Sequence, residues 1–221
     1  MLPRELHGKK VLVSDFDGTI TAHDFFLRVL DRNRAPEVHG YWEALQAGEM
    51  NNFDALKAIF AHVAGGEQEL LEIARETGIE PRLPEYVERL ESAGWKVIVV
   101  SAGCDWYIRE IFAERGIRLP VIANPGRLSD DGRLEMLLPT DSPFYARETG
   151  IDKAAVVRET LEVATVAAFA GDGRPDLTAA RLVAPEYRFA CGWLAEALDR
   201  EGLAYRPFQR WSDVAEMLLH M

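Results

Sequence analysis

Several signals that would assign this sequence to a special class of protein are absent from it. It has only two cysteines, Cys104 and Cys191, which are too few for a disulfide framework and show no metal-ligand spacing. No apolar run approaches the roughly 18 residues that a membrane helix needs. The apolar run nearest the N-terminus, Val11–Val13, is too short for the core of a signal peptide. We therefore expect a cytoplasmic protein with no membrane partner.

Basic charge is also scarce. The chain has 25 lysine and arginine residues against 36 aspartates and glutamates, which gives a net charge of −11. This balance argues against a nucleic-acid partner, because nucleic-acid-binding surfaces need a basic face. Hydrophobic residues make up 48% of the 221 positions and charged residues 28%, which excludes a disordered or fibrous chain. The length predicts one large domain, or one domain with a smaller insertion.

Short apolar segments alternate with amphipathic ones along most of the chain. The nearly continuous apolar segments predict strands covered on both faces, at 11–16, 95–101 and 166–172, with weaker candidates at 119–124 and 187–191. The amphipathic segments predict helices at 84–94, 104–116, 151–162 and 175–184. Such alternation is typical of an α/β fold with a doubly wound, Rossmann-like parallel sheet.

One long segment interrupts this alternation. Residues 21–83 contain no convincing strand, and their pattern predicts helices at 24–32, 37–46, 51–64 (with Asn52 as a cap) and 67–76. We interpret them as a small helical cap inserted after the first strand, with residues 1–20 and 84–221 forming the α/β core. The alternative is that these helices simply cover one common core. In the core, Asp131-Gly132 between two alternating segments predicts a β-hairpin at 126–139.

The first chemical motif is VLVSDFDGTIT, in which an apolar strand leads to Asp15 and Asp17. Residues two apart on a strand share a face, so both carboxylates can point into one pocket. In an open α/β sheet, ligands bind at this edge. A surface turn rich in Asp and Gly is the alternative. A calcium loop is excluded, because Phe26 stands at the twelfth position, where such a loop needs a glutamate.

Two further motifs follow predicted strands. Ser101, Ala102 and Gly103 connect a strand to a helix, and small residues there let backbone N–H groups approach an anion. Asp172 and Asp176 follow the segment AFAG, with Asp176 at the start of a predicted helix. Each motif alone is weak, because a tight strand–helix loop or a capped turn has the same composition.

The fourth feature is Lys153, one of five lysines in a chain with twenty arginines (25 − 5 = 20). A surface lysine is the usual interpretation of such a residue. A lysine in a chain that otherwise prefers arginine also suits a compact point charge beside a phosphate group.

DFDGTIT, the serine of VVSAG, Lys153 and GDGRPD resemble, in order, the four motifs of the haloacid dehalogenase (HAD) superfamily of phosphohydrolases. The helical insertion is similar to the cap that many members carry after the first motif. The resemblance spans nearly the whole chain, from Val11 to the helix near Pro175.

The resemblance implies a phosphatase that acts on a small phosphorylated metabolite. Asp15 would be the nucleophile that forms an aspartyl-phosphate, and Asp17 would protonate the leaving oxygen and then activate water. It also implies a Mg²⁺ ion, because a hard cation suits clustered carboxylates and a phosphate oxygen. The implied metal ligands are Asp15, the main-chain carbonyl of Asp17, and Asp172, with Asp176 in support. The implied phosphate-binding groups are Ser101, the amides of Ala102 and Gly103, and Lys153.

Two branches of the superfamily are candidates for the substrate. DFDGTIT-x-x-D, SAGCDWYI and RPFQRWSDV resemble the phosphatases of methionine salvage, which act on a methylthio-sugar enol-phosphate. GDGRPD is closer to the phosphoserine phosphatase form, and the cysteine-rich segment of some methionine-salvage proteins is missing. Asp24 stands where phosphoserine phosphatases have a glutamate, but no arginine lies between Arg34 and Arg75 to meet a substrate carboxylate. The candidate substrate contacts in the insertion are Asp24, Arg28 and Lys57.

Other activities of the same fold remain open. A phosphoryl mutase would use the same aspartates and return the phosphoryl group to the substrate. An inactive binding module would be expected to lack one motif residue, and none is lost here. A dehalogenase would need neither Mg²⁺ nor Asp17. The sequence makes no prediction of the oligomeric state.

Overall fold

The computed structural model describes residues 1–33, 35–63 and 65–221. Its central feature is a six-stranded sheet with the order β10-β9-β8-β1-β2-β3, in which every neighbouring pair is parallel. The strands are β1 (Lys10–Ser14), β2 (Trp95–Cys104), β3 (Val121–Asn124), β8 (Val166–Gly171), β9 (Arg188–Ala190) and β10 (Arg206–Pro207). The doubly wound α/β prediction is confirmed, and of these six described strands the two-residue β10 is the one that lies outside the expected ranges.

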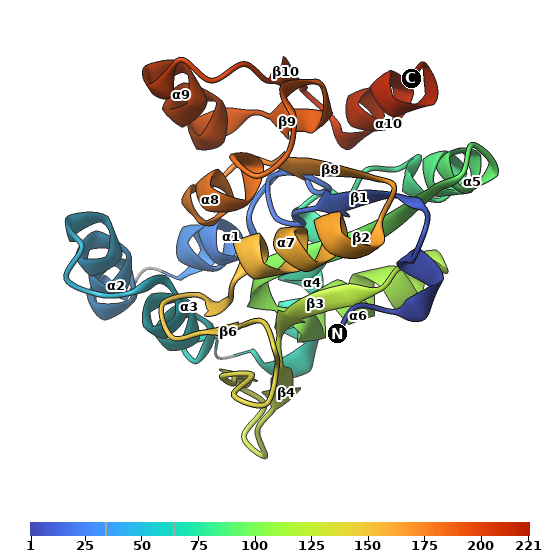
Figure 1. Ribbon diagram of the computed structural model, residues 1–221. Helices are drawn as coiled ribbons and strands as arrows, with labels where there is room; N and C mark the ends of the chain where they lie inside the picture. The colour runs from blue at the N-terminus through green and yellow to red at the C-terminus, as the bar shows by residue number, and fades with distance from the viewer. Residues whose placement is uncertain (34, 64) are drawn as a thin grey trace.

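Helices cover both faces of the sheet (Figure 1). They are α5 (Leu83–Ser92), α6 (Asp105–Arg115), α7 (Lys153–Val163), α8 (Leu177–Ala180), α9 (Gly192–Glu201) and α10 (Trp211–Leu219), with short 3₁₀ turns at Arg4–Leu6, Arg174–Asp176 and Pro185–Tyr187. On β1, Leu12 packs in one apolar cluster with α5, α6 and α10, whereas Val11 and Val13 pack in another with α7, α8 and α9. This division follows from the alternation of side chains along a strand.

The insertion after β1 is helical, as expected. Its helices are α1 (Phe25–Arg32), α2 (Pro36–Ala47), α3 (Asn52–Phe60) and α4 (Gly66–Glu76), and α1–α3 lie together on one side of the molecule (Figure 1). The cap of α3 is Asn51, whose side chain accepts from the Asp54 amide, one residue before the expected position. Ala64, the last residue of the expected helix, lies outside the described residues.

The helices of the insertion share one apolar cluster with the sheet. Phe25 of α1 stacks on Tyr107 of α6, with ring centroids 4.1 Å apart and an interplanar angle of 8°. Both rings belong to the cluster that contains Leu12 of β1. The division of the chain into a cap and a core therefore stays a prediction.

Two hairpins lie on the path from β3 to α7. β4 (Gly126–Leu128) and β5 (Leu134–Met136) are antiparallel, and Gly132 has a φ of +79° in their turn, which confirms the Asp-Gly prediction. β6 (Tyr145–Ala146) and β7 (Gly150–Ile151) form the second hairpin.

The helix expected at 175–184 is shorter in the structure, where α8 spans Leu177–Ala180. Ala184 precedes Pro185 and is extended, as residues before proline prefer. The buried guanidinium of Arg188 also donates hydrogen bonds to the carbonyl oxygens of Ala180 and Val183. None of the helices in the described part of the chain has the length and apolar character needed to cross a bilayer.

Candidate active site

The candidate site lies where β1, β2 and β8 end. Residues from these three strand ends line one cavity of about 490 Å³, and residues of the helical insertion line its other side. Ser14, the last residue of β1, pairs with Val99 of β2 and Ala170 of β8. The parallel register therefore brings Asp15, Ser101 and Asp172 to one edge of the sheet, although they are far apart in the sequence.

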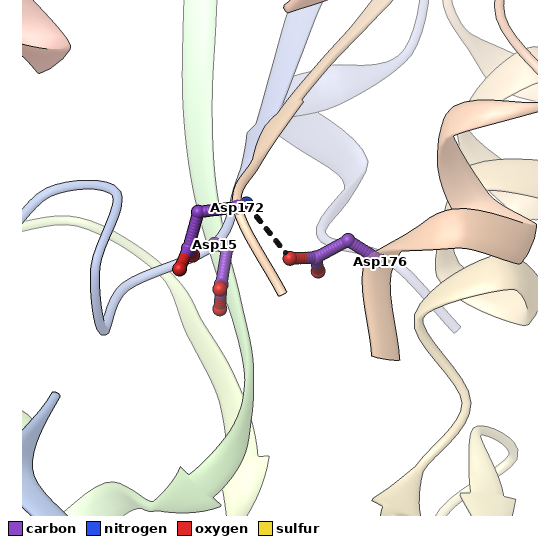
Figure 2. A group of neighbouring side chains, drawn as sticks. All are labelled: Asp15, Asp172 and Asp176. Carbon is purple, nitrogen blue, oxygen red and sulfur yellow. Dashed lines mark hydrogen bonds between the residues drawn. The ribbon is translucent and has the colours of Figure 1, made fainter. Parts of the chain in front are cut away.

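Three carboxylates gather at this edge. Asp15, Asp172 and Asp176 each offer an oxygen to a group in which all the atoms lie within 4.8 Å of one another. Figure 2 shows their carboxylates turned toward a common space. The Lys153 ammonium lies 2.6 Å from Asp15 Oδ1 and 2.6 Å from Asp176 Oδ1. Lys153 is only 3% exposed, so it neutralises charge away from bulk water.

The charges of this cluster are not balanced. Burial, followed by the charge of Asp176, raises the pKa of Asp15 above its ordinary value, although Lys153 acts in the opposite direction. Burial and the same neighbour raise the pKa of Asp172 to about 7. Burial disfavours the Lys153 cation, but attraction by Asp15 and Asp176 outweighs it and raises the lysine pKa. Three carboxylates around one ammonium are a donor set that fits a hard divalent cation.

Asp176 differs from the other two carboxylates because its hydrogen bonds are nearly complete. It is fully buried, and it accepts from Lys153 and from the amides of Asp172 (3.0 Å) and Gly173 (2.9 Å). The first of these amide bonds is the dashed line in Figure 2. Asp176 therefore holds the loop that carries Asp172.

The loop after β1 closes tightly over Asp172. Gly18 has a φ of +70°, and a Cβ on it would lie 2.3 Å from Asp172 Oδ2. The next residue, Thr19, donates its hydroxyl to Asp172 Oδ1 at 2.9 Å. Only glycine fits this backbone conformation and this space, so the loop itself positions the carboxylate.

Asp17 lines the same cavity, but its carboxylate lies outside the three-carboxylate group. It accepts from the Phe25 amide at 3.0 Å and from the Tyr107 hydroxyl. Burial raises the pKa of Asp17 even though both hydrogen bonds act to lower it. A raised pKa favours the protonated form of a carboxyl group, which is the form that a general acid needs.

The small residues after the second motif strand also line the cavity. Ser101, Ala102 and Gly103 are buried within β2, which is three residues longer than expected. The Gly103 amide donates to Ser101 Oγ at 2.9 Å. A Cβ on Gly103 would lie 3.2 Å from Asp17 Oδ2, so this turn approaches the carboxylate closely.

The three candidate substrate contacts have different positions. Asp24 lines the cavity, and burial, followed by the charge of Asp17, raises its pKa to about 8. Among the described residues, those that line the cavity do not include Arg28 or Lys57. Arg28 pairs with Asp31 at 3.0 Å, and Lys57 is exposed.

Sequence reasoning missed two residues that act on the motif aspartates. Thr19, which binds Asp172, lies inside DFDGTIT, so its position in that motif was an available signal. Tyr107, which binds Asp17, lies in the segment 104–116 that was expected to be a helix, and its spacing with the apolar residues there gives no sign of a polar contact. Its ring packs in the core, while its hydroxyl donates to Asp17 and the residue lines the cavity.

The chain is similar to several proteins of known name or known structure. The chain is 23% identical over 214 residues to the 2-hydroxy-3-keto-5-methylthiopentenyl-1-phosphate phosphatase of Brevibacillus brevis, covering 95% of each chain. It is 26% identical over 216 residues to Pdp3-interacting factor 1 of Schizosaccharomyces pombe, covering 91% of each. The phosphoserine phosphatase of T. onnurineus has a similar fold, with a TM-score of 0.68 and 21% identity, over 100% of this chain and 98% of that one. Residues 12–181 match the family of haloacid dehalogenase-like hydrolases, and the protein belongs to that family.

Proposed function

We propose that this protein hydrolyses phosphate monoesters of a small metabolite through a phosphorylated Asp15, with Mg²⁺ as its cofactor. The observation that carries the proposal is the meeting of Asp15, Asp172, Asp176 and Lys153 in one buried cluster at the edge of a cavity. The names of the relatives as phosphatases support the same activity.

Asp15 is the nucleophile in this proposal. One of its carboxylate oxygens attacks phosphorus and the ester oxygen leaves, which gives an aspartyl-phosphate and splits the reaction into two easier steps. Lys153, at 2.6 Å from Asp15 Oδ1, is placed to attract phosphoryl oxygens as charge develops on them. Ser101, Ala102 and Gly103 line the same cavity. The Ser101 hydroxyl accepts from the Gly103 amide and keeps its own hydrogen to donate to a phosphoryl oxygen.

Asp17 is the proton donor and acceptor. In the first step it gives a proton to the leaving ester oxygen, and in the second it takes one from the water that hydrolyses the aspartyl-phosphate. Its raised pKa supports this role, and the bonds from Phe25 and Tyr107 fix its carboxyl group.

The residues present fit Mg²⁺. Asp15, Asp172 and the main-chain carbonyl of Asp17 would hold the ion, while Asp176 supports the Asp172 loop through its amide bonds. When bound, the ion would offset the negative charge of the carboxylates and of the substrate phosphate.

The cavity wall on the side of the insertion favours an apolar leaving group. It is lined by Phe26, Leu27, Trp42, Leu45 and Leu56, and the rings of Phe26 and Trp42 lie 5.0 Å apart. We therefore propose the methylthio-sugar enol-phosphate of methionine salvage as the substrate, and residues 21–83 as a cap that excludes water from it. This choice agrees with the name of the Brevibacillus brevis relative.

Phosphoserine is the second candidate. Its ammonium group would need an acidic partner and its carboxylate a basic one. Asp24 and Arg174 both line the cavity. Asp24 would carry the negative charge once an adjacent ammonium group lowers its raised pKa. Arg174 is exposed and lies over the Trp193 ring, 5.4 Å from the ring centroid.

The test is a phosphate-release assay with Mg²⁺ over a panel that includes both candidate substrates. Acid quench during turnover should leave one phosphoryl group on the peptide that contains Asp15. Asp15→Asn should abolish release, whereas Asp141→Asn, at an exposed loop position, should not. Normal turnover by Asp15→Asn would refute the mechanism. An isomerised phosphate ester instead of free phosphate would identify a mutase, and inactivity with every divalent ion would identify a binding module.

A further inference from the structure

A buried chain of hydrogen bonds joins the C-terminal helix to the candidate nucleophile. The indole Nε1–H of Trp211 donates to Ser14 Oγ at 3.0 Å, and the Ser14 hydroxyl donates to the Asp15 carbonyl oxygen at 2.8 Å. Trp211 is 1% exposed and Ser14 is 0% exposed. These buried hydrogen bonds therefore connect Trp211 to Ser14, which is 197 positions away in the sequence. The mechanism proposed above does not use them.

The direction of this chain is fixed by chemistry. An indole nitrogen is a donor only, so Ser14 Oγ must accept from Trp211 and cannot donate to it. The single hydroxyl hydrogen of Ser14 is then free to point to the Asp15 carbonyl. Burial keeps competing water away, so both bonds are ordered and each polarises the other.

This chain of hydrogen bonds lies where the pairing of β1 with its neighbouring strands ends. Ser14 is the last residue of β1 paired with both neighbouring strands. Beyond it, the Asp15 amide still donates to the Ala170 carbonyl at 2.9 Å. The Ser14 hydroxyl supplies a donor for the Asp15 carbonyl, so the peptide groups on both sides of the Asp15 Cα are tied down. Small errors in the position of a nucleophile are costly in rate.

Trp211 is itself held firmly. It is the first residue of α10, and the amides of Gln209 and Arg210 both donate to Asp213 Oδ2 at 2.9 Å just before and within the first turn. Within the first turn, the Ser212 amide donates to Glu80 Oε2 at 3.4 Å. The start of α10 is therefore fixed both within the helix and against the segment before α5.

We infer that Trp211 and Ser14 are positioning residues for Asp15: they orient its main chain so that its carboxylate faces the phosphate. The inference rests on the proposed function, because it concerns the residue that the proposal makes the nucleophile. It predicts that breaking the chain slows transfer of the phosphoryl group to Asp15 and leaves substrate affinity nearly unchanged.

The test uses Trp211→Phe, which keeps an aromatic ring and removes the donor. The matched control is Trp95→Phe, which makes the same change in the same apolar cluster at the far end of β2, where Trp95 pairs with Lys10. Rapid acid quench measures the rate of Asp15 phosphorylation, and thermal unfolding measures stability. We expect phosphorylation to slow by about fivefold or more in Trp211→Phe, the effect of one buried hydrogen bond, with KM within about twofold of wild type.

A second variant separates positioning from packing. Ser14→Ala removes both bonds of the chain, so the double variant with Trp211→Phe should phosphorylate Asp15 no more slowly than Ser14→Ala alone. Additive effects would overturn the inference, as would wild-type phosphorylation in Trp211→Phe or equal slowing in Trp95→Phe. If wild type itself never carries phosphate on Asp15, the proposed function and the inference both fail.

Discussion

The clearest quantitative prediction concerns removal of the Lys153 charge. Lys153→Met keeps an unbranched side chain and deletes the ammonium that lies 2.6 Å from both Asp15 and Asp176. Removing one partner of a buried ion pair typically costs about 3–5 kcal/mol, because the remaining charge is left without compensation. The free energy of unfolding of the metal-free protein should therefore fall by about 3 kcal/mol at pH 8.

The sign of the pH dependence follows from the carboxylates. Lys153 now acts to lower the pKa values of Asp15 and Asp172, both of which burial raises. Without the lysine, these folded-state pKa values rise further above the unfolded ones. A group whose folded pKa is raised loses stability as the pH increases toward that pKa. The cost of Lys153→Met should therefore be larger at pH 8 than at pH 5.

Urea unfolding in the presence of a chelator, followed by circular dichroism at both pH values, measures this cost. The control is Lys96→Met, which removes a partly exposed ion pair with Glu91 and should cost less than about 1 kcal/mol. The reasoning is wrong if Lys153→Met costs no more than Lys96→Met at pH 8, or if its cost grows toward low pH.

Three further predictions concern the cavity. The pKa of Asp24 is about 8 in the folded protein against an ordinary 3.8, so the free energy of unfolding falls as pH rises between these values. Urea unfolding at pH 8.5 should therefore find Asp24→Asn a few kcal/mol more stable than wild type. Equal stability would contradict the pKa shift. Gly18→Ala should lower phosphatase activity about a hundredfold, because its Cβ would lie 2.3 Å from Asp172 Oδ2. The control is Gly94→Ala, at a φ of +84° with open space around it. It should lower the free energy of unfolding by about 1 kcal/mol and leave the activity unchanged. Mg²⁺ added to chelated protein should raise the unfolding temperature of wild type and of Asp141→Asn, but not of Asp172→Asn.

The motif aspartates were predictable because their signal is local. An apolar run followed by Asp15, and another followed by Asp172, places each residue at a strand end, and parallel strands end at the same edge. The role of Lys153 was not derivable in this way. It stands at the start of α7, and only the resemblance to a family placed it beside the aspartates.

Two of the candidate substrate contacts, Arg28 and Lys57, do not line the cavity, and the reason is geometric. The sequence does not say which face of each helix of the insertion meets the cavity. On α3 that face carries Asn52 and Leu56, which are four residues apart and share one side. Lys57 is one residue further along, about 100° around the helix, and is exposed. Helix periodicity gives the faces of a helix, but only packing decides which face is turned inward.

The contacts made by Trp211 had no signal in the sequence. Its partner Ser14 is 197 residues away, and an aromatic residue opening an amphipathic helix looks like any other core residue. The same is true of Tyr107, whose ring satisfies the apolar spacing while its hydroxyl binds Asp17. Side chains that combine an apolar body with one polar atom are read by periodicity as apolar, and the polar atom is found only when its partner is in place.

The charge of the site links these observations. Asp176 is fully buried, and its bonds to Lys153 and two amides use both of its oxygens, so it is already compensated. Asp15 and Asp172 are not, because their raised pKa values mark carboxylates that are buried with too few partners. A phosphate ester brings further negative charge to the same place. If the protein binds Mg²⁺ and a phosphate ester as proposed, each should favour binding of the other by the same factor, and the unbalanced carboxylates should strengthen that coupling.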